Sequence, residues 1–212
     1  MTSPSRVEGL QFDAGSVERL TIALSRHAQH HPNATAIILG ERRIGFAELE
    51  RRTRAVQSFL TARGIGLGDR IAWCGVNHPD FFPVMLAAMR SGAVLAPINW
   101  RQKQREISYI LADSGARLIF ADEAFNATVR DSAPPGADVI QTAALSKHLD
   151  EAGPSDADIG GDRNAPALLL YTSGTTGNPK GVQLAEAAIS VGRRMEELTG
   201  AFDDWTDREV LL

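Results

Sequence analysis

Residues 168–182 read LLLYTSGTTGNPKGV, and this stretch carries the strongest signal for the fold of the chain. It begins with an apolar run, Leu168 to Leu170, that is typical of the end of a buried strand. Gly174 and Gly177 then allow the backbone to turn tightly and to approach a ligand closely. The stretch therefore predicts a strand that ends in a ligand-binding loop.

The loop has the composition of a phosphate site. Successive backbone N–H groups can form an anion-binding concavity, hydroxyl groups add donors, and Lys180 brings a mobile positive charge. The hydroxyl groups belong to Thr172, Ser173, Thr175 and Thr176. The common nucleotide loop G-x-x-x-x-G-K-S/T does not fit, because Lys180 follows Pro179 and precedes Gly181. Many Ser/Thr/Gly loops between strands bind nothing, so composition alone leaves that alternative open.

Residues 171–182 resemble the phosphate-binding signature of the adenylate-forming superfamily, which includes acyl-CoA synthetases, luciferases and the adenylation domains of peptide synthetases. The family form is Y/F-T/S-S-G-S/T-T-G-x-P-K-G-V, and the chain satisfies each specified position. Further stretches resemble the acyl-CoA synthetase branch in the family's order, and they are residues 43–49, 86–97, 98–101 and 106–111.

This resemblance implies an enzyme that activates a carboxylic acid, in this branch a fatty acid, with ATP and Mg²⁺ and then transfers the acyl group to coenzyme A. It implies that the loop holds the pyrophosphate part of ATP, with Lys180 as the catalytic residue that pairs with it. The implied cofactor-binding residues are Thr172, Ser173, Gly174, Thr175, Thr176, Gly177 and Lys180. No residue is assigned to a metal.

Apolar segments alternate between strand and helix character, which predicts an α/β fold with a mainly parallel sheet and crossover helices. Helices are expected at 46–63, 80–91, 104–113, 123–130 and 186–198, and strands at 34–39, 42–45, 70–76, 94–98, 117–121, 137–141, 168–170, 181–184 and 208–212. Residues 153–164 are expected to form an exposed connection. Cys74 is expected to lie in a buried strand, and Asn99 to hold a turn by bonding nearby backbone.

The composition is that of an ordinary globular protein, with 212 residues, 43% hydrophobic content and a formal net charge of −4. The charges are interspersed, so no basic stripe indicates nucleic acid and no polybasic run indicates anionic lipid. Cys74 is the only cysteine, which excludes an internal disulfide and fits a reducing cytoplasm. We expect neither export nor a membrane-spanning segment. The expected partners are the small-molecule acid, ATP and coenzyme A.

The resemblance implies that residues 1–212 form an incomplete, N-terminal part of the family's large domain. The family's adenine, ribose, acyl and magnesium segments and its C-terminal domain have no counterpart here, so we expect this chain alone not to complete ligation. The alternative is a truncated, non-catalytic module that binds phosphate or a partner. An uncovered sheet edge at 208–212 is expected to favour self-association. Relatives usually have Thr or Ser and then His where this chain has Ala185 and Glu186, and Ala185 cannot cap the helix expected after it.

Overall fold

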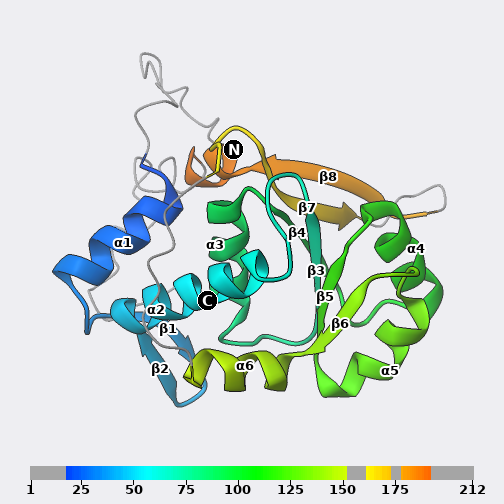
Figure 1. Cartoon of the computed structure of the whole chain (residues 1–212), viewed down its shortest axis with the longest axis horizontal. Helices are drawn as coiled ribbons and strands as arrows, with labels where there is room; N and C mark the ends of the chain where they lie inside the picture. The colour runs from blue at the N-terminus through cyan, green and yellow to red at the C-terminus, as the bar shows by residue number, and fades with distance from the viewer. Residues whose placement is uncertain (1–17, 152–160, 173–177, 192–212) are drawn as a thin grey trace, which may run out of the picture.

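The computed structural model describes residues 18–151, 161–172 and 178–191 and shows an α/β fold (Figure 1). Within these residues, six strands form the main sheet in the order β6-β5-β3-β4-β7-β8, and two further strands form a separate antiparallel hairpin. The strands are β1 (Thr35–Leu39), β2 (Arg42–Gly45), β3 (Arg70–Cys74), β4 (Val94–Ile98), β5 (Leu118–Ala121), β6 (Asp138–Gln141), β7 (Pro166–Thr172) and β8 (Lys180–Ala185). The helices are α1 (Leu20–His30), α2 (Phe46–Thr61), α3 (Phe81–Ser91), α4 (Gln104–Ser114), α5 (Glu123–Ser132) and α6 (Thr142–Glu151).

Helices cover both faces of the parallel part of the sheet. Strands β3, β4, β5 and β6 pair in parallel, and successive side chains of each strand point to opposite faces. Trp73 of β3 packs with α2, α3 and α6 on one face, whereas Cys74 packs with α4 and α5 on the other. Because both faces of β3, β4 and β5 are buried, these three strands are apolar almost throughout, whereas the edge strand β6 begins with Asp138 and ends with Gln141. The predicted α/β class and the buried position of Cys74 are confirmed.

Most predicted elements are present, with shifted ends. Residues 142–151 differ, because they form α6, for which the sequence predicted no helix. The apolar pattern of this segment is short, because the large apolar side chains that α6 buries are Leu145 and Leu149, one helical turn apart. The Arg101 amide donates to Asn99 Oδ1 at 3.0 Å, which confirms the turn predicted at Asn99.

Three predicted segments extend outside the described residues. They are the connection at 153–164, the helix at 186–198 and the strand at 208–212. Residues 186–191 of that helix are described and are helical.

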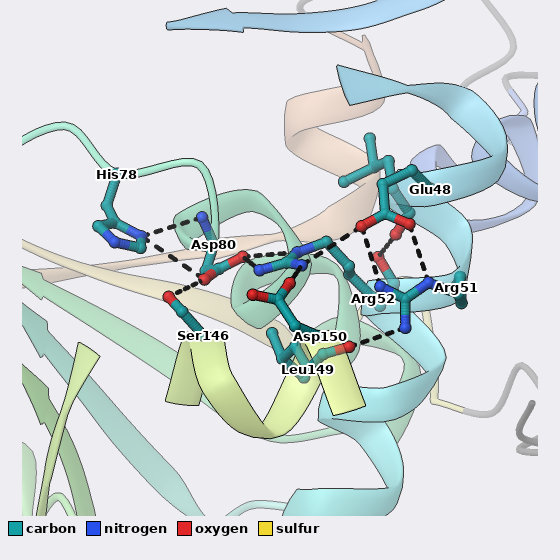
Figure 2. Close-up of polar contacts among 10 residues, drawn as sticks. Glu48, Arg51, Arg52, His78, Asp80, Ser146, Leu149 and Asp150 are labelled. Carbon is teal, nitrogen blue, oxygen red and sulfur yellow. Dashed lines mark hydrogen bonds and ion pairs between the residues drawn. The ribbon is translucent and has the colours of Figure 1, made fainter. Parts of the chain in front are cut away.

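A buried ion pair joins α2 to the start of α3 (Figure 2). The Arg52 side chain on α2 and the Asp80 carboxylate before α3 are both withdrawn from solvent. Arg52 Nε donates to Asp80 Oδ1 at 2.7 Å, and the Ser146 hydroxyl on α6 donates to the other carboxylate oxygen. Arg52 also donates to Asp150 on α6, and this hydrogen bond holds the pKa of the Asp150 carboxyl below its usual value. The network therefore fastens three helices together on one face of the sheet.

A second buried carboxylate holds α1 to the end of the β7–β8 ribbon. Glu186 directly follows β8 and is 2% exposed. It accepts hydrogen bonds from Arg19 Nε at 2.9 Å and from the amide and hydroxyl of Thr21 at 3.2 and 2.9 Å. Arg19 does not cap α1 with its own side chain, so Glu186 satisfies an amide in the first turn and places a negative charge there. Glu186, which stands where relatives usually have His, thus helps to hold α1 in place.

Replacing Asp80 with alanine is expected to lower the free energy of unfolding by about 3–5 kcal/mol, because Arg52 would stay buried without its main partner. Urea unfolding followed by circular dichroism measures the change. The control is Lys147→Ala, which removes an exposed ion pair with Glu151 on α6 and is expected to cost less than about 1 kcal/mol. Equal effects of the two substitutions would contradict the importance of the buried pair.

The variant Glu186→Gln keeps the shape of the side chain and removes its charge. We expect it to lower the free energy of unfolding by roughly 1–3 kcal/mol, because an amide donor would then face the Arg19 guanidinium. Amide hydrogen exchange in the first turn of α1 should become faster. Glu151→Gln, in the exposed pair with Lys147, is the matched control. Unchanged exchange at Thr21 in Glu186→Gln would show that this carboxylate does not hold α1.

Candidate functional site

The predicted phosphate loop joins two antiparallel strands, β7 and β8. Thr172, the last residue of β7, lies directly opposite Lys180, the first residue of β8. The structure therefore brings together the two predicted site residues that flank the loop. The other predicted site residues lie outside the described residues, and they are Ser173, Gly174, Thr175, Thr176 and Gly177.

Lys180 carries a positive charge at the end of this ribbon. It is exposed, and no residue in the described part of the chain forms an ion pair with it. Pro179, directly before it, is buried and has a fixed backbone φ, which limits the conformations of the chain where β8 begins. A flexible ammonium group in this position can bind phosphate oxygens as a point charge.

The strand that leads into the loop is anchored to α4. The Tyr171 hydroxyl donates to Asp113 Oδ2 at 2.6 Å. Burial raises the pKa of Tyr171, and the hydrogen bond to Asp113 raises it further, so the phenol stays protonated and remains a donor. Across the ribbon, a Cβ atom at Gly181 would approach the Tyr171 ring to 3.3 Å and Leu169 Cδ1 to 3.0 Å. The glycine after Lys180 thus makes room for the tyrosine ring.

The sequence analysis did not identify Asp113 as part of this region. It lies 58 residues before Tyr171, near the end of α4, and only the fold brings the two side chains together. No local sequence signal marks it, because an aspartate near the end of a polar helix face is common. Asp113 is therefore a residue that the structure adds to the site.

Within the main sheet, the β7–β8 ribbon follows β4 and lies near the amino ends of the parallel strands. β7 pairs with β4 at one position, where Leu168 lies opposite Leu95. Leu169 then shares a hollow of about 130 Å³ with Arg70 and Val94, the first residues of β3 and β4. Figure 1 shows β7 and β8 near one end of β3 and β4, and α6 near the other end. The described ends of the loop therefore lie away from the carboxyl ends of the strands, where α/β proteins commonly bind ligands.

A larger cavity lies at those carboxyl ends, beside β3 and β4. It has a volume of about 280 Å³, and its lining includes Trp73, His78, Phe81 and Phe82. The sequence analysis gave none of these residues a functional role. The structure thus separates two regions, a charged ribbon at one end of the parallel strands and an apolar cavity at the other.

The described residues contain no group of three or more His, Cys, Asp or Glu side chains that could hold a metal ion. None of the helices in that part of the chain combines the length and apolar character needed to cross a membrane.

The chain matches the family model described as AMP-binding enzyme over residues 24–211. It is 36% identical over 200 residues to the fatty acid–(acyl-carrier-protein) ligase ScoC of Streptomyces coeruleorubidus, which covers 92% of this chain and 38% of that protein. It is 36% identical over 165 residues to a feruloyl-CoA synthase of an Amycolatopsis species, which covers 78% of this chain and 33% of that protein. The chain thus spans 33–38% of the length of these curated relatives.

Solved structures show the same similarity. The inhibitor-bound N-terminal domain of FACL13 from Mycobacterium tuberculosis matches with a TM-score of 0.70 and 29% identity, over 80% of this chain and 44% of that chain. VinN matches with a TM-score of 0.79 and 24% identity, over 87% of this chain and 50% of that chain, and supports the fold alone. The resemblance inferred from residues 171–182 is confirmed. The chain belongs to the AMP-binding enzyme family.

Proposed function

We propose that this chain supplies the ATP-phosphate-binding part of an acid–CoA ligase, which activates a carboxylic acid and transfers the acyl group to coenzyme A. Family membership over residues 24–211 supports this proposal, as do relatives named as a fatty acid ligase and a feruloyl-CoA synthase. The observation that carries it is the register of the ribbon, which pairs Thr172 with the exposed Lys180 on either side of the loop.

The proposed chemistry explains why the loop needs these groups. A carboxylate oxygen of the acid attacks the α-phosphorus of ATP, the bond to the bridging β-phosphate oxygen breaks, and pyrophosphate leaves. Negative charge grows on the leaving group, and fixed donors stabilise that charge without a proton transfer. Lys180 provides an ammonium group and Thr172 a hydroxyl. By resemblance to the family, residues 173–177 provide the remaining amide and hydroxyl donors.

The remaining reactants are Mg²⁺, the carboxylic acid and coenzyme A. Mg²⁺, when bound, neutralises part of the phosphate charge, and we assign none of its ligands here because the described residues hold no metal-binding cluster. A fatty acid is the proposed acid, since ScoC is named as a fatty acid ligase. Coenzyme A is the proposed acceptor, in agreement with the feruloyl-CoA synthase.

The alternative function is a phosphate-binding module without catalysis. The chain spans 38% of ScoC and 33% of the feruloyl-CoA synthase. One phosphate loop supplies neither recognition of the nucleobase nor a pocket for the acid. We therefore expect these 212 residues alone to bind pyrophosphate without completing adenylation.

Isothermal titration of pyrophosphate and of ATP with Mg²⁺ into the 212-residue chain tests the phosphate site. Lys180→Ala is expected to weaken binding roughly 10- to 100-fold, because it removes a charge-assisted contact worth about 1.5–3 kcal/mol. Lys147→Ala removes an exposed lysine from α6 and should leave the affinity unchanged. Equal binding by the wild type and Lys180→Ala would show that phosphate does not bind at this ribbon.

Exchange of label between pyrophosphate and ATP, measured with a panel of fatty and aromatic acids, tests whether these residues catalyse adenylation on their own. Pyrophosphate binding without exchange is the expected result for this chain and supports its role as the phosphate-binding part. Acid-dependent exchange that is lost in Lys180→Ala would show that these residues catalyse adenylation alone, and it would reject the non-catalytic module.

A further inference from the structure

The cavity at the carboxyl ends of β3 and β4 is separate from the phosphate ribbon. After β3 the chain continues to α3 on one face of the sheet, and after β4 it continues to α4 on the opposite face. Neighbouring parallel strands whose connections leave to opposite faces form a topological switch point, the place where open α/β sheets bind ligands. The described part of the β7–β8 ribbon lies at the amino ends of the same strands, away from this switch point.

The walls of the cavity are mostly apolar, and aromatic rings form part of them. Trp73, Phe81 and Phe82 line it, and the rings of Trp73 and Phe81 meet edge to face with their centroids 5.7 Å apart. Leu39 of the β1–β2 hairpin adds an aliphatic wall, and Val76 adds an apolar side chain that is 47% exposed. The volume of about 280 Å³ lies just below the range of roughly 300–1,000 Å³ for ligand pockets, which fits a molecule with one ring.

The imidazole of His78 gives this cavity a defined hydrogen-bond donor. Its Nδ1 accepts a hydrogen bond from the Asp80 amide at 3.1 Å (Figure 2). A backbone amide can only donate, so the neutral ring carries its proton on Nε2, on the side away from Asp80. Burial lowers the pKa of His78, which keeps the ring neutral at pH 7. Among the described residues, no hydrogen-bond acceptor pairs with this Nε2 proton.

Charged groups of both signs lie around His78. The carboxylates of Asp80 and Asp122 act to raise the pKa of His78. The guanidinium groups of Arg42 and Arg52 act to lower it. Arg52 and Asp80 neutralise each other in their buried pair. Apolar walls also penalise a charged group that has lost its water. An uncharged ligand is therefore favoured.

We propose that this cavity binds a small, uncharged molecule that has one aromatic ring and one hydrogen-bond acceptor. The ring packs against Trp73 and Phe82, and the acceptor receives the proton on Nε2 of His78. This binding site goes beyond the proposed ligase function and does not depend on the phosphate loop.

Ligand-observed NMR titration of the 212-residue chain with acetophenone and with α-methylstyrene tests the proposal. The two probes have nearly the same shape, and only the ketone has an acceptor oxygen. We expect acetophenone to bind in the millimolar range, as suits a probe with few atoms. It should bind roughly three- to tenfold more tightly than α-methylstyrene, the effect of one neutral hydrogen bond. Equal affinities, or tighter binding of benzoate than of acetophenone, would overturn the assignment.

Three substitutions locate the bound probe. Leu39→Trp fills the cavity and is expected to abolish binding of both probes, whereas Ile38→Trp, on the other side of β1 and outside the lining, should retain it. His78→Phe keeps an aromatic ring beside Trp73 but has no ring nitrogen and therefore no donor, so the ratio of the two affinities should fall to about one. The ratio of the two affinities tests the role of His78 in the site even if Leu39→Trp does not fold.

Pyrophosphate provides the last control. It should leave acetophenone binding unchanged, because the ribbon and the cavity lie at opposite ends of the parallel strands. Competition between the two, or acetophenone binding that survives Leu39→Trp in folded protein, would overturn the proposed site.

Discussion

Two opposite charges that have no access to solvent must lie within hydrogen-bond distance of each other, and Arg52 and Asp80 satisfy this requirement between α2 and α3. Leaving either charge alone in the interior would cost several kcal/mol, so the pair limits where α3 can begin. Ser146 and Asp150 join the same network and fasten α6 to it (Figure 2). The Asp80 amide in turn fixes the tautomer of His78. One buried ion pair thus organises a helical layer and one wall of the cavity.

The β7–β8 ribbon depends on two other carboxylates, one near each of its ends. Asp113 accepts the hydrogen bond from Tyr171 beside the loop, and Glu186 binds Arg19 and Thr21 where the ribbon leads into the next helix. Neither carboxylate belongs to the Arg52 network. The same parallel strands therefore carry a charged, exposed ribbon at their amino ends and an apolar cavity at their carboxyl ends, and each end has its own anchors.

The sequence predicted the alternation of strands and helices because the central strands are buried on both faces and their apolar runs are continuous. The Asn99 turn was also predictable, since its hydrogen bond reaches a backbone amide only two residues away. Helix α6 was missed because Leu145 and Leu149 alone make too short a periodic pattern. The role of Glu186 was missed for a different reason, because its partners lie 165 and 167 residues away in the sequence.

The sequence by itself determined the family, the α/β class and the chemistry available to the loop, because all three depend on residue types at fixed local spacings. Only the tertiary structure decided that the ribbon lies near the amino ends of the parallel strands and that Tyr171 meets Asp113. It also decided that His78 joins aromatic side chains from β3 and α3 around one cavity. These arrangements depend on contacts between segments that are distant in the sequence. Such contacts form when the two faces of the sheet are buried, and no local sequence pattern predicts them.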